Sequence, residues 1–481
     1  MKRPNSLPAN LLLITFDQWR GDWGDPWEPV IRLPSLESLA SRGWTSRRCY
    51  TSSPHCVPAR FSWLTGMSPG ELGVTMNMDI NINTGAPSIF RNLQKDGWFT
   101  SLIGKTHWTS HRLKHDLRNN EHIIKSLGFD EVLEVAGPRA LRRVTCQLTD
   151  EWEQAGVLEK YRKDLKKRYS AGRSPKAWEV RETVLPLDLY PDIWIADKGC
   201  QKLSEMPRNK PWLLWVSFVG PHEPFDTPLP WKGRHDHIKL PKATKPGSWI
   251  KDLPQHGELQ EAFRSWEGKL DQHSIDMCRT DYADKLTLLD DQIGKLLAVL
   301  KKRSDAVSTA VLITSDHGEM LGDSNMLYKG VFLEGSIRVP WVYKQPENSI
   351  HKHKNSFFKA VALTGMLKQT LKGLKTGGHA IEMERWGQKQ KGAIIEFGRE
   401  KMLVRDNYKL ALDQNGLPLW AINLEDDPKE QINILNKASL FWKLKPQWRS
   451  IRQWAEEIRI DSQSGHRKEF EELEIFKPDV E

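Results

Sequence analysis

Residues 56–60, with the sequence CVPAR, bring a nucleophile, a helix start and a permanent cation together. Pro58 suits the first turn of a helix, where its missing N–H costs no hydrogen bond, so Cys56 would lie at a helix N-terminus. That position favours negative charge, and Arg60, one turn further on, carries a forked donor suited to sulfate, phosphate or carboxylate. The spacing predicts an oxyanion site. For these five residues alone, a cysteine buried for packing beside a surface arginine is the alternative.

Four short apolar runs elsewhere in the chain each end in polar residues that could serve such a site. These polar residues are Asp17-Gln18, Lys105-Thr106-His107, His222 and Asp316-His317. Continuous apolar runs bounded by turn residues are typical of buried strands in a mainly parallel sheet. Because ligands of such sheets bind at the carboxyl ends of the strands, we expect these side chains to gather at one edge.

Helical patterns between these strands indicate an α/β fold. Residues 35–42 place apolar side chains at helical spacing and end at Gly43, and residues 281–303 place a row of Leu and Ile on one face. Acidic residues open the second helix and basic residues close it, as the helix macrodipole favours. We predict a large mixed, mainly parallel sheet flanked by helices.

The C-terminal part of the chain has a different pattern. Residues 402–405, 408–412 and 418–423 are strand-like, and Asn415-Gly416 predicts a hairpin turn. We therefore expect a catalytic α/β domain at 8–390 with a variable insertion at 130–188, and a smaller α+β subdomain with an antiparallel sheet at 391–437. Residues 438–481 predict an amphipathic helical tail that docks on the body or on a second copy of the chain.

Several stretches resemble the sulfatase family of the alkaline phosphatase superfamily. The signature-like segment is YTSSPHCVPARFSWLTG at 50–66, and further stretches in the family's order include LLLITFDQWRGD, LIGKTHW, VSFVGPHEPF, VLITSDHGEMLGD and YKGVFLEGSIRVPWV. The resemblance covers residues 10–435 and implies an alkaline phosphatase-like fold. It also implies hydrolysis of sulfuric esters.

For Cys56 the resemblance implies oxidation to formylglycine by a separate maturation enzyme that reads the CxPxR pattern. The hydrate of that aldehyde would attack sulfur, and loss of a proton from its second hydroxyl would then expel sulfate. The family's ligand positions correspond to Asp17, Gln18, Asp316 and His317, which would hold one divalent cation. Gln18 and His317 depart from the commoner Asp and Asn. Ca²⁺ is the first expectation, with Mn²⁺ or Mg²⁺ as alternatives, and the imidazole shifts preference towards transition metals.

The resemblance also suggests roles for four basic residues. Lys105 and His107 lie two apart, so on an extended segment they would flank the hydrated aldehyde from the same side. His107 would take the proton from its second hydroxyl. His222 resembles the histidine that contacts the leaving group, and Lys329 the lysine that binds sulfate; either could protonate the departing alcohol.

Two further residues are expected to contact substrate. Asn77 resembles a residue that approaches the substrate in some relatives, although a turn asparagine explains it equally well. The ring of Trp108, next to His107, could stack on a sugar or a quaternary ammonium. By contrast, we expect the histidines in polar stretches to be surface residues without a role. These are His111, His115, His235 and His237.

The substrate class is divided between two branches of the family. The Asp17-Gln18 pair, followed by Trp19-Arg20, resembles phosphonate monoester hydrolases and related phosphodiesterases. The segment around Cys56 and the region of Lys329 look closer to choline sulfatases, so sulfate monoesters are favoured. A sulfatase-like binding protein that retains unmodified Cys56, and a thiolate nucleophile, are the remaining alternatives.

Composition limits the other possibilities. The chain has 481 residues and only five cysteines, an odd number at irregular spacing, which argues against a disulfide framework. The N-terminal apolar run is short and continues into Asp17, so it predicts a first strand in a cytoplasmic enzyme and no membrane span. The formal charge is +9, with much of the excess at 139–176, either as solvated surface or as a rim that attracts a small anionic sulfate ester. Nucleic-acid binding is disfavoured because no recognition motif accompanies the charge.

Overall fold

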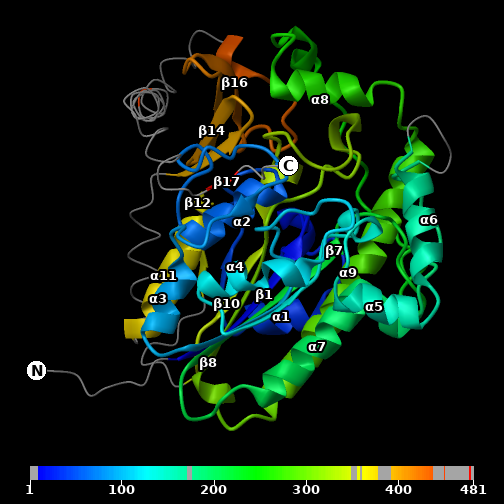
Figure 1. Cartoon of the computed structure of the whole chain (residues 1–481). Helices are drawn as coiled ribbons and strands as arrows, with labels where there is room; N and C mark the ends of the chain where they lie inside the picture. Colours follow the sequence, from blue (N-terminus) through cyan, green and yellow to red (C-terminus); the bar gives the residue numbers. More distant parts are fainter. Residues whose placement is uncertain are drawn as a thin grey trace, which may run out of the picture.

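A central sheet with helices on both faces dominates the computed structural model, which describes residues 9–170, 176–347, 355–357, 360–376, 392–436, 449 and 476–477 (Figure 1). The eight strands have the order β11-β2-β10-β8-β1-β7-β5-β6. Their bounds are β1 Asn10–Asp17, β2 Trp44–Ser46, β5 Phe99–Gly104, β6 Glu131–Glu134, β7 Trp212–Pro221, β8 Thr309–Ser315, β10 Trp341–Lys344 and β11 Asn355–Phe357. Strands β8, β1, β7, β5 and β6 pair in parallel, whereas β10 is antiparallel to both neighbours. The predicted mixed, mainly parallel sheet is confirmed.

Strand β1 explains why the apolar runs are continuous. Leu12, Ile14 and Phe16 belong to the apolar cluster on one face of the sheet, while Leu11 and Leu13 belong to the cluster on the other. Because successive side chains of a strand point to opposite faces, both faces need apolar residues when both are covered by helices.

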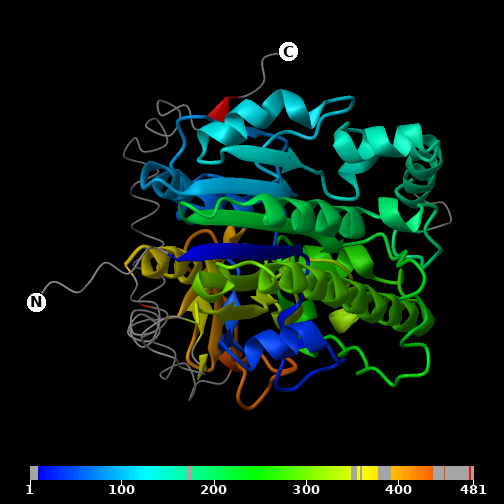
Figure 2. The same cartoon turned by 90° about the horizontal axis from the view of Figure 1, so that it is seen from below.

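Different helices cover the two faces. Side chains from α1 (Pro34–Ala40), α5 (Gln147–Gln154), α6 (Leu158–Arg168), α7 (Pro191–Glu205) and α9 (Gln272–Lys301) form the first cluster. Those from α2 (Cys56–Thr65), α3 (Ile89–Lys95), α4 (Glu121–Ser126) and α11 (Leu363–Thr376) join the second. Helices α7 and α9 run side by side (Figure 2). Helix α9 begins earlier than predicted because Asp271 caps it, accepting a 2.7 Å hydrogen bond from the backbone N–H of Ser274.

The segment 130–188 begins as the edge strand β6 and continues into α5 and α6, which lie at one edge of the molecule (Figure 1). Smaller pairings complete the body. Strand β3 (Cys49–Tyr50) lies between β12 (Val361–Ala362) and β9 (Arg338–Val339), and β4 (Asn81–Ile82) pairs with β17 (Phe476–Lys477). Helices α8 (Glu258–Trp266) and α10 (Glu334–Ile337) are the remaining α-helices among the described residues.

The C-terminal part forms the expected antiparallel sheet. Strands β13 (Ala393–Phe397), β14 (Glu400–Arg405), β15 (Tyr408–Leu412) and β16 (Pro418–Asn423) pair in sequence order. Gly416 has φ 78° in the β15–β16 turn, which supplies the left-handed position that the Asn-Gly pair predicts. One face packs against Leu259 of α8 and Trp249. Most of the predicted helical tail lies outside the described residues, and the exact domain limits stay a prediction.

All five cysteines are free thiols. Within the described ranges, none of the helices combines the length and the apolar character that a membrane span requires.

Candidate active site

The carboxyl ends of four neighbouring strands meet at one edge of the sheet. Strand β1 ends at Asp17, β5 at Gly104, and β8 just before Asp316, while His222 follows β7. Gly104 has φ 106°, and an added Cβ would collide with the carbonyl oxygen of Ser217 on β7. The glycine therefore lets the chain turn sharply beside β7, where the site residues follow.

Cys56 lies at the centre of this edge, and α2 begins at it as predicted. Its Sγ lies 3.1 Å from Nε2 of His317 and 3.7 Å from Oδ1 of Asp17. The Nζ of Lys329 donates to the same sulfur at 3.2 Å. Cys56, Asp17 and His317 are buried, so residue 56 faces acids and bases that water does not screen.

The residues around Cys56 form a donor set that fits a divalent cation. Ligand atoms of Asp17, Cys56, Asp316 and His317 all lie within 4.8 Å of one another. The Nδ1 of His317 lies 3.0 Å from the carbonyl oxygen of Gly318, which can only accept. Nδ1 therefore carries a hydrogen, which leaves Nε2 as the ring nitrogen that could bind a metal.

Gln18, the fourth predicted metal ligand, is part of the same network. Its Oε1 accepts a 2.6 Å hydrogen bond from Nζ of Lys329. Its Nε2 donates to Glu223 at 3.1 Å and also to Glu319. Burial and the charge of Glu223 raise the pKa of Glu319 to about 7. Two carboxylates that sequence reasoning missed therefore fix the orientation of the Gln18 amide.

Arg60 connects the helix that begins at Cys56 to the ends of the neighbouring strands. It is fully buried, and its Nε donates to Oδ2 of Asp316 at 2.7 Å. Its Nη1 donates to the backbone oxygen of Lys105 at 2.7 Å and to the hydroxyl of Ser217 at 3.1 Å. The fork thus joins helix α2 to the ends of β5, β7 and β8.

The cations control the ionisation of the two groups at the centre. Burial alone would raise the pKa of Asp17, but the charges of Lys105 and Lys329 hold it well below its ordinary value. Burial and Asp17 would likewise raise the pKa of the Cys56 thiol, yet Lys105, Lys329 and His317 lower it strongly. Lys105 itself pairs with Asp17. The site is therefore built for negative charge at residue 56.

His222 is oriented by the residue that follows it. Its Nδ1 lies 2.8 Å from the carbonyl oxygen of Glu223, which can only accept, so Nδ1 carries the hydrogen and Nε2 is left to exchange a proton. Burial lowers the pKa of His222 to about 4 in spite of the Glu223 carboxylate. Glu223 in turn pairs with Arg139, which comes from the segment after β6.

His107 and His111 stack with their ring centroids 4.7 Å apart and an interplanar angle of 8°. Burial and the charge of Lys105 lower the pKa of His107 well below its ordinary value, so its imidazole is neutral. The pKa of His111 is lowered as well, first by burial and then by His107. The structure brings a histidine pair to the site where the sequence predicted one histidine.

Two of the four histidines expected at the surface are buried, so that prediction is wrong for them. His111 lies against His107, and His235 contacts Oδ1 of Asp284 through Nδ1 at 2.7 Å. His237 is exposed and His115 is half-buried. Polar sequence context failed as a guide because the burial of His111 and His235 comes from loops folded onto the body.

Asn77 lies at the site, and Trp108 does not. The Oδ1 of Asn77 accepts a 2.9 Å hydrogen bond from the backbone N–H of Val57, so it satisfies a free donor at the start of α2. Trp108 is fully buried in the apolar cluster around α2 and α3, and its Nε1 donates to the backbone oxygen of Arg60 at 3.0 Å. The expectation that its ring contacts substrate is wrong, because the ring is fully buried in the core and is not among the described residues that line the cavity at Cys56.

A cavity of about 340 Å³ leads to Cys56. Its described lining residues are Cys56, Asn77, Met78, Asp79, Lys105, His107, His111, Gly137, Arg139, Ala140, Arg143, His222 and Lys329. Cys56, Lys105, His107, His222 and Lys329 of the predicted site thus line it together with residues of the segment after β6, whereas Arg60 does not.

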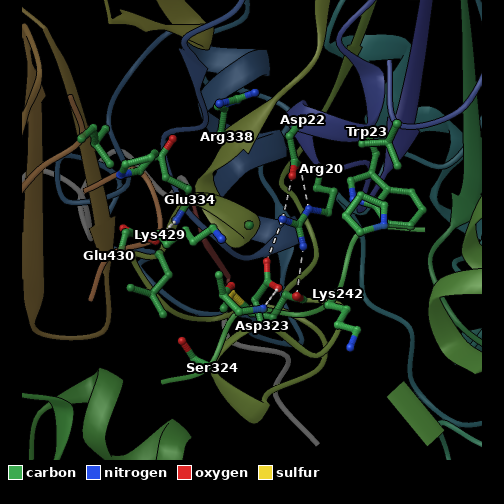
Figure 3. A pocket seen from close by; sticks show the side chains of 18 of the residues that line it. Arg20, Asp22, Trp23, Lys242, Asp323, Ser324, Glu334, Arg338, Lys429 and Glu430 are labelled. Carbon is green, nitrogen blue, oxygen red and sulfur yellow. Dashed lines mark hydrogen bonds and ion pairs between the residues drawn. The ribbon is translucent and has the colours of Figure 1, made fainter. Parts of the chain in front are cut away.

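A second cavity, of about 370 Å³, lies between the α/β core and the C-terminal sheet (Figure 3). Arg20 reaches into it and pairs with both Asp22 and Asp323. Lys242 stands at its edge (Figure 3). None of the predicted site residues is among its described lining residues, whereas Cys56, Lys105 and His107 line the first cavity.

Comparisons with known proteins agree with the fold and the site. The sulfatase family model matches residues 9–366. The chain belongs to the sulfatase family.

It is 27% identical over 451 residues to an arylsulfatase of Clostridium perfringens, covering 89% of this chain and 91% of the relative. It is 26% identical over 451 residues to a choline-sulfatase of Rhizobium meliloti, covering 88% and 82%. A phosphonate monoester hydrolase of Agrobacterium radiobacter shares the fold, with a TM-score of 0.70 and 20% identity over 95% of this chain and 96% of that one. The predicted family is confirmed, and with it the assignment of the chain as a sulfatase enzyme.

Proposed function

We propose that this sulfatase cleaves a sulfate monoester by means of formylglycine at position 56 and one bound divalent cation. The observation that supports the proposal most strongly is the set of charged and metal-ligating side chains that contact Cys56. Its sulfur contacts His317, Asp17 and Lys329 in a buried cluster at the end of a cavity. A cysteine buried for packing alone would not need such neighbours.

Asp17, Asp316 and His317, joined by Gln18, would hold the cation. The cation would supply positive charge to the nucleophile and to a sulfate oxygen. Oxygen ligands suit Ca²⁺, our first choice, or Mg²⁺, while the imidazole makes Mn²⁺ a strong alternative. Formylglycine would supply, as its hydrate, the oxygen nucleophile that displaces the alcohol from sulfur.

The chain's own cations would bind the sulfate. Lys105 and Lys329 both line the cavity beside Cys56, and each contacts a residue of the cation site. Arg60 lies behind them and would act as a positioning residue, since its donors are directed at Asp316 and the backbone of Lys105. Two ammonium groups facing one oxyanion favour charge that develops on sulfate oxygens in the transition state.

Two histidines would act as general base and general acid. His107 is neutral because of its lowered pKa, so it can accept a proton from the hydrate. His222 lines the cavity, and its Nδ1 is held by the carbonyl oxygen of Glu223, which leaves Nε2 for proton exchange. An anionic substrate would favour the imidazolium that protonates the departing alcohol. Lys329 is the alternative donor at that step.

Other parts of the proposal concern the protein's surroundings. A formylglycine-generating enzyme would act on the CVPAR segment, and a cytoplasmic location and a homo-oligomer formed through the C-terminal tail stay predictions.

Parallel turnover of 4-nitrophenyl sulfate and 4-nitrophenyl phenylphosphonate by the matured protein tests the proposal. Faster sulfate release that is lost in Cys56→Ala supports it. Faster phosphonate release would move the activity to the phosphonate monoester and phosphodiester branch. Release of neither product by protein with unmodified Cys56 would favour a binding protein.

A further inference from the structure

The cavity that leads to Cys56 has a cationic wall beyond the residues that serve the sulfate. This wall comes from the segment after β6 and includes Gly137, Arg139 and Arg143. A Cβ added to Gly137 would lie 3.2 Å from Nζ of Lys105, so the wall begins in contact with the proposed sulfate-binding lysine. Arg139 and Arg143 follow within six residues, around the 3-10 turn Ala140–Arg142.

Arg139 is held in place by other residues of the protein. It pairs with Glu223, and its guanidinium lies 4.9 Å from the ring centroid of Tyr169 and 5.0 Å from that of Tyr328. These contacts fix the wall against the residue that orients His222. Arg139 therefore shapes the cavity next to the leaving group.

Arg143 is the cation that the protein leaves available. It is exposed at the cavity, and among the described residues its guanidinium makes no hydrogen bond, close ion pair or ring contact. Its charge does act on Asp79: against burial, the hydrogen bonds from Ser110 and His111 and then the charge of Arg143 lower the pKa of that carboxyl. The one carboxylate in the described lining, Asp79, is already engaged. Its Oδ1 accepts hydrogen bonds from the hydroxyl of Ser110 at 2.7 Å and the backbone N–H of His111 at 2.9 Å.

The same lining does not suit a cationic alcohol. Recognition of a quaternary ammonium uses the faces of Trp, Tyr or Phe. None of these residue types is among the described residues that line this cavity. Lys105 and Arg139 are paired with Asp17 and Glu223, but Lys329 and Arg143 still outnumber Asp79 in the described lining and would repel a second positive charge.

We infer that the preferred substrate is a sulfate ester whose alcohol part carries a second anionic group, a carboxylate or another sulfate, and that Arg143 binds this group. The inference rests on the proposed function, since it takes the first sulfate to lie at Cys56. It assigns a specificity role to part of the 130–188 segment. It also separates this chain from enzymes that act on choline sulfate.

Binding to the Cys56→Ala protein tests the inference without the need for turnover. The probes are 3-sulfooxybenzoate, its monoanionic isostere 3-sulfooxybenzamide with a neutral amide as second group, benzene-1,3-diyl disulfate and choline sulfate, measured by titration calorimetry. We expect the two dianions to bind about 10-fold more tightly than the amide, the worth of one charge-assisted hydrogen bond. The tighter dianion identifies the second group. Choline sulfate should bind more weakly than the amide.

Variants in the same background assign the preference to Arg143. Arg143→Ala should bring the dianion-to-amide ratio close to 1, and Arg143→Lys should restore part of it. Lys242→Ala removes one positive charge from the other cavity and should leave the ratio unchanged. Equal affinity for benzoate and amide, tighter choline sulfate, a ratio that survives Arg143→Ala, or no binding at millimolar concentration would each overturn the inference.

Turnover by the matured wild-type protein distinguishes failure of the second anion site from failure of the proposed sulfatase activity. Equal kcat/KM for the benzoate and the amide would refute this inference while leaving sulfate hydrolysis in place. Selective binding of the dianions without hydrolysis of any sulfate would support the anion subsite and refute the proposed function.

Discussion

Replacing Arg60 tests how strongly the site depends on its buried fork. The side chain is fully buried and donates to Asp316, to the backbone of Lys105 and to Ser217 at 2.7 to 3.1 Å. In Arg60→Ala the carboxylate of Asp316 would lose its charged partner, and removing one member of a buried pair costs about 3–5 kcal/mol. Arg60→Lys keeps the charge but loses the fork, so about 1–3 kcal/mol should be lost.

Urea unfolding of metal-free protein with unmodified Cys56 measures these losses without involving maturation or turnover. Arg42→Ala is the matched control, because Arg42 lies just after the end of α1, is exposed and, among the described residues, donates only to Ser38. It should change the free energy of unfolding by less than about 0.5 kcal/mol. If Arg60→Ala also stays within about 1 kcal/mol of wild type, Arg60 does not hold the strand ends together and the reasoning fails.

Three other changes follow from single contacts. Gly104→Ala combines a positive φ with a collision against Ser217, so a thermal melt should show that the free energy of unfolding falls by at least about 3 kcal/mol. The control Gly97→Ala, at φ 84° and in open space, should lower it by only about 1 kcal/mol. Equal losses in the two variants would contradict the collision. Burial raises the pKa of Glu134 from 4.5 to about 7, so the folded state binds the proton more tightly than the unfolded state does. Wild type therefore loses stability as the pH rises from 4.5 to 7. Relative to wild type, Glu134→Gln should gain about 3 kcal/mol between pH 5 and pH 8 in urea unfolding, and a gain that does not change with pH would refute the assignment. Trp108→Phe should lower the free energy of unfolding by about 1–3 kcal/mol, because the indole packs in the core and hydrogen-bonds the backbone. KM for an aryl sulfate should stay within about twofold of wild type. A raised KM at unchanged stability would restore Trp108 as a substrate contact.

The strand-end residues could be predicted from the sequence for a topological reason. Asp17 and Asp316 follow apolar runs, and parallel strands bring their carboxyl ends to one edge regardless of the distance along the chain. The helix start at Cys56 was equally local, because Pro58 fixes it. Such patterns depend on periodicity and on one or two neighbouring residues.

The residues that sequence reasoning missed depend on contacts between distant segments. Glu223 matters through Gln18, 205 positions away, and through Arg139. His111 gains its role only because its loop folds back onto His107. The acid after His222 was the one local signal, since a buried histidine needs a partner for its second nitrogen.

Trp108 shows the opposite error, in which closeness along the chain was read as closeness in space. His107 has φ 59°, so the backbone turns there and directs the next side chain into the core while His107 lines the cavity. Alternation along an extended segment already directs Trp108 to the side opposite His107, so the expectation of a substrate contact neglected that rule.

The central claim is that residue 56 becomes formylglycine and acts as the nucleophile. Mass spectrometry of the peptide that contains Cys56, from protein made in its native host, tests it most directly when paired with turnover of 4-nitrophenyl sulfate on the same sample. The account predicts formylglycine at position 56, with turnover in proportion to the converted fraction. Full turnover by protein whose Cys56 is unmodified would contradict it.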